Sequence, residues 1–373
     1  MPTGGKFMIT ITDNYFEESA AFKTMGVELP KKQASTHTVN WLHFGGGNLF
    51  RAFHMEVQQD LINKGISTSK IALVETFDKE LIENIYHINN NRALKVELTN
   101  GGKNRITLLD SIKESIYLNN ESDFDSVKKY FISEKLQLIT FTITEKGYNL
   151  KDSNGNYYSF IEEEMKNGPT YATTTIGWLI RLLNERFLAG AFPLALVSTD
   201  NFSHNGDKLK NSVLTIAKEW QMKGFLSQAF LTYLENDKKI SFPWSMIDRI
   251  TPNPSSIVQA QLQDLGFSGM DIIKTNKGSI SAAFSNTEET HYLVIEDDFP
   301  NGRPDLAQAG VILTDRETVD KIERMKVCTC LNPLHTSLAI FGSLLRYEYI
   351  YDEMRDEDLR QLVHKSGSKQ VSD

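Results

Sequence analysis

The sequence predicts an α/β protein with a doubly wound, mostly parallel sheet, followed by a mainly α-helical domain. Apolar runs alternate with segments of helical spacing, and glycine or polar residues directly follow several runs, which together predict the sheet. After about residue 275 the alternation gives way to helical spacing, which predicts the second domain. At 373 residues the chain also exceeds the usual size of a single hydrophobic core.

Each element of the sheet domain follows from a local pattern. In chain order we expect strand 39–44, helix 51–63, strand 70–75, a hairpin over 96–109, helix 123–134, strand 136–144, helix 173–187, strand 193–198 and helix 208–220. The strands are apolar runs, as in parallel strands buried on both faces, and the helices have apolar residues at three- and four-residue spacing. In the hairpin, Asn100 and Gly101 supply the positive φ angles of a tight turn.

The two ends of the chain differ from this middle part. Residues 1–36 are polar and weakly periodic, which predicts an N-terminal arm ahead of a sheet domain at residues 37–285. Residues 286–373 begin with an extended segment, 290–297, and continue with helical spacing. We therefore expect a helical substrate and catalytic domain there. With under a hundred residues available, we expect it to be incomplete.

A glycine-rich turn joins the first strand to the first helix. Its glycines would let the backbone approach a pyrophosphate closely, while the helix offers free N–H groups and a partial positive charge. The match to G-x-G-x-x-G is incomplete because Phe50 occupies the third glycine position, and a glycine turn without a ligand is the alternative. The predicted cofactor-binding residues here are Phe44, Gly45, Gly46, Gly47, Asn48, Leu49 and Arg51.

Glu75, at the end of the second strand, strengthens the dinucleotide hypothesis. A carboxylate at this position can accept both hydrogen bonds from an adenosine ribose. It would also repel a 2′-phosphate, so we expect NAD rather than NADP. The turn, the carboxylate and the alternating elements together predict a Rossmann-type domain that binds its ligand in the crevice beyond the strand ends.

The segment 326–335 places a lysine, a carboxamide and an imidazole in an otherwise apolar stretch, and these groups can transfer protons. To act as a base near pH 8, Lys326 needs a pKa about two units below its usual value of roughly 10.4, which burial can supply. The alternative is a solvated surface lysine. For His335 the alternative is a hydrogen-bonded core histidine. Asn201, just after a predicted strand, offers a second carboxamide beside Asn332.

The spacing of these residues leaves two geometries open. Asn332 and His335 are three residues apart and so neighbours on a helix, whereas Lys326 lies six residues before Asn332, about 120° away around a straight helix. Pro333 either opens a new helix with Asn332 as its cap, or stands beside a π-bulge that swings Lys326 round.

Two further features have structural alternatives. Cys328 and Cys330, the only cysteines, match neither a zinc ribbon nor a redox pair, so we expect buried thiols and no metal site. Asp248 and Arg249 form a charged pair among apolar residues, which is either a structural ion pair or part of a site.

Charge and composition limit the partners. Lys and Arg number 40 against 48 Asp and Glu, a net charge of -8, which argues against nucleic acid or an anionic membrane. The apolar runs are shorter than a membrane span, and the start has no signal-peptide pattern. We expect a cytoplasmic protein that acts on a small molecule, with its oligomeric state open.

Several motifs, taken in order, resemble the polyol-specific long-chain dehydrogenases, the family of mannitol 2-dehydrogenase, fructuronate reductase (mannonate oxidoreductase) and tagaturonate reductase. They are Phe-Gly-Gly-Gly-Asn-Leu-Phe-Arg-Ala at 44–52, Thr-Ile-Thr-Glu-Lys-Gly-Tyr at 142–148, Ser-Thr-Asp-Asn at 198–201, Phe-Pro-Trp-Ser-Met-Ile-Asp-Arg-Ile-Thr-Pro at 242–252, Val-Ile-Glu-Asp-Asp-Phe-Pro-Asn-Gly-Arg-Pro at 294–304 and Asn-Pro-Leu-His at 332–335. The resemblance spans about residues 38–365, and the joint pattern is specific.

This resemblance implies a Rossmann-type domain followed by a helical domain, an active site between them and no catalytic metal. It further implies these roles: general acid/base for Lys326, alkoxide binding for Asn201 and Asn332, orientation of the reacting oxygen for His335, proton relay for Glu323, and support of the lysine and nicotinamide for Asp248. Family members place the asparagine five residues after the lysine, so here a bulge must absorb one residue. They also continue for many more residues.

The resulting prediction is an NAD-dependent oxidoreductase of a linear sugar acid or polyol, with D-fructuronate and D-mannonate as the expected pair. The Asn-Pro-Leu-His and Gly-Gly-Gly-Asn variants resemble the uronate reductases. Alternatives within the family are mannitol 2-dehydrogenase and tagaturonate reductase. A non-catalytic NAD-binding protein is a rival of another class, and a methyltransferase would leave Lys326, Asn332 and His335 without a role.

Overall fold

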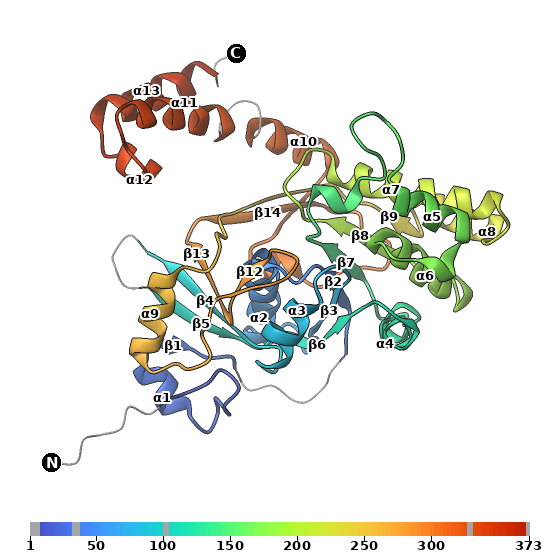
Figure 1. The fold of residues 1–373 in the computed structure, drawn as a ribbon, viewed down its shortest axis with the longest axis horizontal. Coiled ribbons are helices and arrows are strands. Elements are labelled where there is room, and N and C mark those ends of the chain that lie inside the picture. Colours follow the sequence, from blue (N-terminus) through green and yellow to red (C-terminus); the bar gives the residue numbers. More distant parts are fainter. Residues whose placement is uncertain (1–7, 32–37, 100–103, 327–330, 371–373) are drawn as a thin grey trace. The chain divides into compact units, whose positions relative to one another are not determined.

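A computed structural model describes residues 8–31, 38–99, 104–326 and 331–370. The chain forms two compact units, Met1–Leu313 and Thr314–Asp373 (Figure 1). The domain boundary expected at residues 285 and 286 therefore falls inside the first unit.

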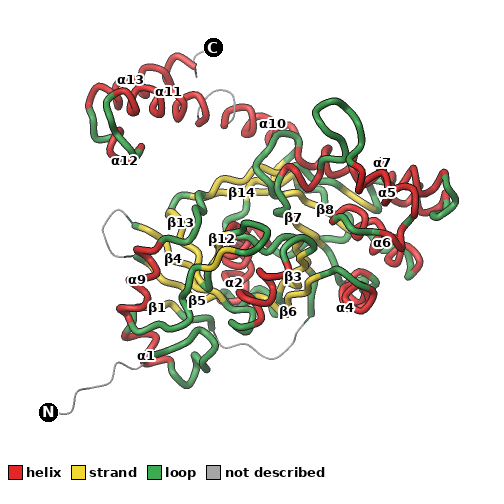
Figure 2. The backbone as a smooth tube through the Cα atoms, viewed as in Figure 1, coloured by secondary structure: helices red, strands yellow, loops and turns green. Residues whose placement is uncertain are grey.

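The first unit is built around a sheet of parallel strands in the spatial order β6-β3-β2-β7-β8-β9 (Figure 1), and Figure 2 draws the strands in yellow. They are β2 (Trp41–Phe44), β3 (Ile71–Glu75), β6 (Ile112–Tyr117), β7 (Leu138–Phe141), β8 (Leu194–Ser198) and β9 (Ile240–Ser241). The first strand in sequence lies at the centre, the next two on one side and the last three on the other. This is the Rossmann order, so the predicted fold class is confirmed, and the order in which strands are added to the sheet reverses between β2 and β7.

Alternate residues along each strand face opposite sides of this sheet and enter two separate cores. One core joins Leu42, Val74, Ile139 and Leu196 to α4 (Glu121–Phe131), α5 (Ser159–Asn167), α6 (Thr175–Leu188), α7 (Asn205–Met222) and α8 (Gln228–Glu235). The other joins Trp41, Leu73, Leu138 and Val197 to the π-helical η1 (Phe50–His54), α2 (Met55–Asn63), the π-helical η2 (Ile82–His87) and the second half of the first unit. Covering both faces explains why these strands read as continuous apolar runs.

A second sheet, β1-β5-β4-β13, contains the predicted hairpin. Its strands are β1 (Val27–Glu28), β4 (Ala93–Leu98), β5 (Arg105–Leu109) and β13 (Phe284–Glu288), and β4 and β5 pair antiparallel as expected. The turn residues 100–103 lie outside the described residues. Residues expected to form a polar arm contribute to this part of the molecule, because Ile11 and Phe22 are buried in its core and β1 pairs with β5. α1 (Ser19–Thr24) and α9 (Ser256–Leu265) complete it.

A third sheet has the order β10-β14-β15, and a small hairpin pairs β11 with β12. The strands are β10 (Ser245–Arg249), β11 (Ile273–Lys274), β12 (Ile280–Ser281), β14 (His291–Glu296) and β15 (Ile312–Thr314). β14 matches the extended segment predicted at 290–297, and it pairs antiparallel with β10. The remaining short helices are α3 (Lys79–Leu81), η3 (Glu145–Tyr148), η4 (Pro169–Tyr171) and η5 (Leu306–Ala309).

The second unit is helical, as predicted for this part of the chain. It contains α10 (Arg316–Arg324), α11 (Leu331–Leu344), α12 (Ile350–Glu353) and α13 (Glu357–Gln370), and α11 packs against α12 and α13. Asp315 caps α10, because its carboxylate accepts a hydrogen bond from the Thr318 N–H at 2.8 Å. Among the described helices of both units, none combines the length and apolarity that crossing a membrane requires.

Candidate active site

The glycine turn lies where β2 ends, at the switch point of the parallel sheet. Gly45 has φ +108°, and a Cβ atom there would lie 2.2 Å from the backbone oxygen of Thr142 at the end of β7, so only glycine fits. A Cβ atom at Gly47, in contrast, would meet nothing within 4 Å. The turn is thus tightly held on its inner side and open at Gly47, which is the geometry that close approach of a ligand requires.

Glu75 ends β3, as the sequence predicted, and its carboxylate ties two turns together. One oxygen accepts the Gly46 N–H at 2.8 Å, and the other accepts the N–H groups of Thr76 at 3.0 Å and Phe77 at 2.9 Å. Burial raises the pKa of Glu75, and these N–H groups oppose that rise. The carboxylate therefore shapes the glycine turn directly, while its contact with a ribose stays a prediction.

Arg51 lies behind the turn with its side chain fully buried. Its guanidinium donates to the Gly46 carbonyl at 3.0 Å and to the Tyr86 hydroxyl at 3.3 Å. It also reaches the hydroxyls of Ser281 at 2.6 Å and Ser285 at 3.3 Å, and the side chain of Asn48. Its donors are thus used inside the protein. In this arrangement Arg51 supports the turn, and the sequence did not predict that role.

The other residues predicted at the turn also have contacts inside the protein. Phe44 is buried in the core, and Leu49 is half-buried. The Asn48 side chain donates to the Ile280 carbonyl at 3.2 Å, so the hairpin β11–β12 braces the turn from a distant part of the sequence. Cofactor contacts by these residues stay predictions.

A group of polar side chains beneath the turn was not predicted. We call it the imidazole network: Trp41, His43, His54, Thr140, Thr142 and Thr199. His43 Nε2 lies 2.9 Å from Thr142 Oγ1, and His54 Nε2 lies 2.9 Å from Thr199 Oγ1. Both threonines donate their hydroxyls to backbone carbonyls, so each accepts from its histidine. This assigns an Nε2–H tautomer to both rings.

Both histidines are completely buried, and this fixes their charge. Burial lowers the pKa of His54 to about 3. Burial also holds the pKa of His43 well below its usual range, and the neighbouring His54 lowers it further. The two rings are therefore neutral at physiological pH. As a hydrogen-bonded support, the network joins β2, β7 and β8 to the helix that follows the glycine turn.

The end of β8 is organised by Asp200, another residue that sequence reasoning missed. Its carboxylate accepts the N–H groups of Ile143 at 2.9 Å and Thr144 at 3.0 Å and the Tyr148 hydroxyl at 2.7 Å. Burial raises the pKa of Asp200, and these hydrogen bonds oppose the rise. Asp200 thereby fastens the segment after β7 to the end of β8. Asn201, the predicted alkoxide-binding carboxamide, follows it directly and is exposed.

Asn205 and Gly206 then hold the start of α7 against β10. The Asn205 side chain donates to the Asp200 carbonyl at 3.1 Å and accepts the Ser245 N–H at 3.1 Å. A Cβ atom at Gly206 would lie 2.6 Å from the Phe242 carbonyl oxygen, so the close approach requires glycine. In the sequence, the dipeptides Asp200-Asn201 and Asn205-Gly206 are the pattern that could have indicated this arrangement.

Asp248 and Arg249 end β10 (Ser245–Arg249), as two consecutive residues of one strand. They are consecutive, so their side chains leave opposite faces of the strand. The Arg249 side chain is fully buried and pairs with Glu56, at 2.6 Å. Asp248 is half-buried opposite Tyr292 on β14. Burial raises the pKa of Tyr292, and the Asp248 charge adds to that rise.

The second unit carries the predicted acid/base residues. Lys326 is 7% exposed and Glu323 is 4% exposed, so the surface-lysine alternative is wrong. Met325 and Lys326 have π-helical backbone. Of the two geometries considered for Lys326, this favours the π-bulge over a new helix capped by Asn332. Residues 327–330, with Cys328 and Cys330, lie outside the described residues, so the expected burial of these thiols stays a prediction.

Asn332 and His335 share one face of α11, as their spacing predicted, and both are exposed. The core alternative for His335 is therefore wrong. In the described part of α11, Asn332 lies inside the first turn rather than at a cap, and its carbonyl accepts the Thr336 hydroxyl at 2.8 Å. The chemical roles of these residues stay predictions.

Several known proteins are similar to this chain in sequence and in fold. The family model of the mannitol dehydrogenase Rossmann domain matches residues 39–308 of this chain. D-mannonate oxidoreductase of Thermotoga maritima is 44% identical, covering 95% of this chain and 67% of that protein. Polyol:NADP oxidoreductase of Gluconobacter oxydans is 28% identical, covering 88% and 64%.

Solved structures agree on the fold. Mannitol 2-dehydrogenase of Pseudomonas fluorescens, in its ternary complex with NAD and D-mannitol, has a TM-score of 0.73 at 24% identity, covering 91% of this chain and 65% of that one. A substrate-free D-sorbitol dehydrogenase has a TM-score of 0.76 at 24% identity, covering 91% and 66%.

Fold and turn together define a protein of the Rossmann dinucleotide-binding class. Within this class, the chain belongs to the mannitol dehydrogenase family, because the family's Rossmann domain matches most of its length. The resemblance seen in the sequence motifs is thereby confirmed. The chain spans about two thirds of the length of each of these four proteins.

Proposed function

We propose that this protein is an NAD-dependent oxidoreductase that interconverts D-fructuronate and D-mannonate. The observation that carries the proposal is the 44% identity to a D-mannonate oxidoreductase over nearly the whole chain. At that level of identity, a shared reaction class is the expectation. A more distant D-mannonate oxidoreductase, of Escherichia coli, is 25% identical and points the same way.

The glycine turn supports the cofactor part of the proposal. Gly45 is held against the end of β7, whereas the space beside Gly47 is open, so a pyrophosphate can approach the backbone at the start of the helix. Glu75 at the end of β3 would accept the ribose hydroxyls and disfavour a 2′-phosphate. Bound NAD supplies the hydride acceptor at C4 of its nicotinamide.

In the oxidation direction, the Lys326 side chain accepts the proton of the substrate hydroxyl while the carbinol carbon loses its hydride. Asn201 and Asn332 donate hydrogen bonds to the developing alkoxide, each worth roughly 3 kcal/mol when preorganised. His335 orients the reacting oxygen, and Asp248 supports the lysine. Glu323 carries the proton onward from Lys326. Reduction reverses these steps, and the lysine ammonium returns the proton.

The decisive experiment follows NADH absorbance with fructuronate, tagaturonate and fructose at equal concentrations. We expect fructuronate to give the highest kcat/KM, and a clear preference for fructose or tagaturonate would identify one of the other family activities instead. Thermal stabilisation by NAD without turnover on any of these substrates would mean a non-catalytic NAD-binding protein.

The acid/base assignment has its own test. Lys326→Ala should lower kcat by at least about 1,000-fold and leave the Kd for NADH unchanged, because the amine acts only on the substrate proton. Lys321→Ala is the matched control, since Lys321 lies five residues earlier, exposed and paired with Glu317. Equal turnover of the two variants would refute the assignment.

A further inference from the structure

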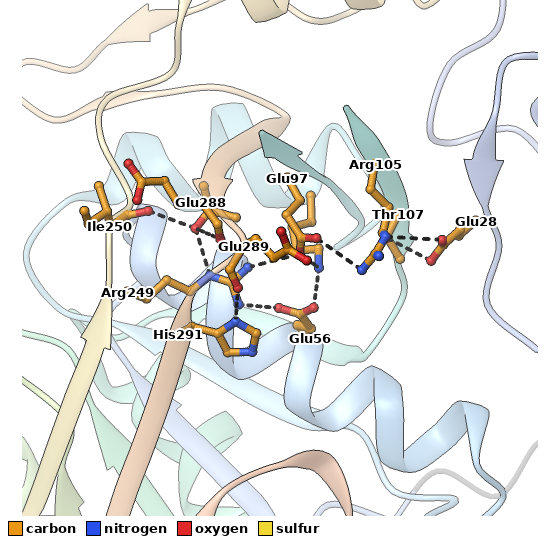
Figure 3. Close-up of polar contacts among 12 residues, drawn as sticks. Glu28, Glu56, Glu97, Arg105, Thr107, Arg249, Ile250, Glu288, Glu289 and His291 are labelled. Atoms are coloured by element: carbon orange, nitrogen blue, oxygen red, sulfur yellow. Dashed lines mark hydrogen bonds and ion pairs between the residues drawn. The ribbon is translucent and has the colours of Figure 1, made fainter. Parts of the chain in front are cut away.

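A second buried polar group contacts the same helix as the imidazole network, and it consists of charged side chains (Figure 3). We call it the charged cluster: Glu56 on α2, Lys95 and Glu97 on β4, and Arg249 on β10. The Lys95 ammonium contacts the Glu56 carboxylate and lies 3.0 Å from that of Glu97. The four side chains are at most 17% exposed, so two cations and two anions balance one another with little help from water.

Arg249 connects this cluster to the candidate site. Its Nη1 donates to Glu56 at 2.6 Å, its Nε donates to the Thr287 hydroxyl at 2.8 Å, and its Nη2 lies 3.8 Å from the Glu97 carboxylate. One guanidinium therefore reaches α2, β13 and β4. A planar fork with several donors suits such a branched contact, whereas a lysine ammonium acts as a single point of charge.

The two ends of the ion pair lie next to parts of the proposed reaction machinery. Arg249 directly follows Asp248, so fixing its side chain fixes the backbone of Asp248 from the opposite face of β10. Glu56 follows the π-helical turn that leads out of the glycine turn. The ion pair thus connects β10, which contains Asp248, to the helix that follows the glycine turn.

Stability alone is a weak reason for such a cluster. Replacing a buried ion pair by apolar residues of similar volume is often neutral or stabilising, and the best-attested use of buried charges is to fix one arrangement. β10 needs such fixing, because the strand order β10-β14-β15 gives it a ladder partner on one side only within the described sheet.

We propose that the ion pair between Arg249 and Glu56 is a positioning device that holds Asp248 in register with the glycine turn and so sets the rate of the chemical step. The inference rests on the proposed function and adds two residues to it. Neither residue touches substrate or cofactor in this account. Both act through the place they give to Asp248.

The test compares two double variants of the full chain. E56Q/R249M removes one cation and one anion from the charged cluster and leaves Lys95 paired with Glu97. K70M/D110N is the matched control, because Lys70 and Asp110 form another partly buried ion pair, 2.7 Å long and 18% and 15% exposed, and neither residue belongs to β10. For each we would measure kcat, KM, the Kd for NADH, and the deuterium isotope effect with NADH labelled at C4.

We expect the two variants to unfold at similar urea concentrations, while E56Q/R249M alone loses about 100-fold in kcat, as a misplacement of about 1 Å can cost. The Kd for NADH should change less than threefold, and the isotope effect should rise because hydride transfer becomes slower. Glu56 and Arg249 would be purely structural if the kcat of E56Q/R249M matched that of the control.

One further measurement separates this inference from the proposed function. Hydrogen exchange of the peptide 245–250 should be faster in E56Q/R249M than in K70M/D110N, with β2 equally protected in both. A wild-type chain without turnover would overturn the proposed function. Faster exchange confined to 245–250 would then still support the fixing of β10, and unchanged exchange would overturn it.

Discussion

The imidazole network and the charged cluster hold the same helix by opposite physical means. His54 belongs to the first and Glu56, two residues later, to the second. The imidazole network is neutral and uses ring N–H groups and hydroxyls, as in the 2.9 Å contact of His54 with Thr199. The charged cluster holds full charges and uses ion pairs, as in the 2.6 Å contact of Glu56 with Arg249.

Because of this difference, the two regions should be disrupted by different changes, one by acid and the other by the loss of a charged side chain. Burial disfavours charge on the histidines, so the imidazole network is sensitive to acid. In the charged cluster, burial raises the pKa of Glu97, but hydrogen bonding and charge from Lys95 and the charges of Arg105 and Arg249 outweigh it and lower that pKa. The charged cluster should therefore withstand mild acid but not the loss of one member.

The largest expected effect comes from removing one charge. Lys95→Met should lower the free energy of unfolding by about 3–5 kcal/mol, because it leaves the carboxylates of Glu56 and Glu97 facing each other with Arg249 as the remaining cation of the cluster. Urea unfolding would measure it. The double variant K95M/E97Q should lose less than K95M alone, and a larger loss in the double variant would contradict the picture of balanced charges.

The next effect is the acid sensitivity of the imidazole network. The folded-state pKa values of His43 and His54 lie below the unfolded value of about 6.5, so below that pH the unfolded chain binds extra protons. The two neutral rings therefore contribute their full stabilisation above the unfolded pKa of about 6.5. On acidification the free energy of unfolding should fall by at most about 1.4 kcal/mol per pH unit for each ring. For His54 this fall should end near pH 3, where the folded-state ring takes up its proton. Urea unfolding at pH 7, 6 and 5 would show the slope.

Two variants sharpen this test. His54→Gln removes one titrating ring and should make the slope shallower. Thr199→Val removes the same hydrogen bond but no titrating group, so it should lower stability at every pH and keep the wild-type slope. Equal slopes in wild type and His54→Gln would show that the buried ring is not the origin of the acid sensitivity.

The same two regions show what the sequence could predict. The strand runs and the glycine turn are local patterns, so β2, β3, β7 and β8 follow from neighbouring residues. The charged cluster joins residues far apart in the chain: Arg249 and Glu56 are separated by 193 positions. Pairings of that kind depend on how α2 packs against the sheets that contain β4 and β10, which no local pattern records.

The packing of two other segments could not be predicted from the sequence for the same reason. The first 36 residues look like a polar arm, yet Ile11, Tyr15 and Phe22 are buried because β5 and α9, far along the chain, provide apolar partners. Arg51 is predicted from the sequence to contact the cofactor, which stays a prediction, but its hydrogen bonds to serine hydroxyls on β12 and β13 were not foreseen. In both cases the composition of a segment was visible, but its partners were not.

The smallest expected effect comes from Arg105, an exposed residue that contacts one member of the charged cluster. Arg105 pairs with Glu97 at 3.1 Å, but its side chain is 52% exposed, and Figure 3 shows it between Glu97 and Glu28. Because water can solvate the groups left behind, Arg105→Gln should cost about 1 kcal/mol or less, and 0.5 M salt should remove most of that cost. Lys95→Met should keep most of its cost in salt, since buried pairs are poorly screened. If both losses vanished in salt, the cluster would be a surface feature, and the positioning role argued for Arg249 would lose its physical basis.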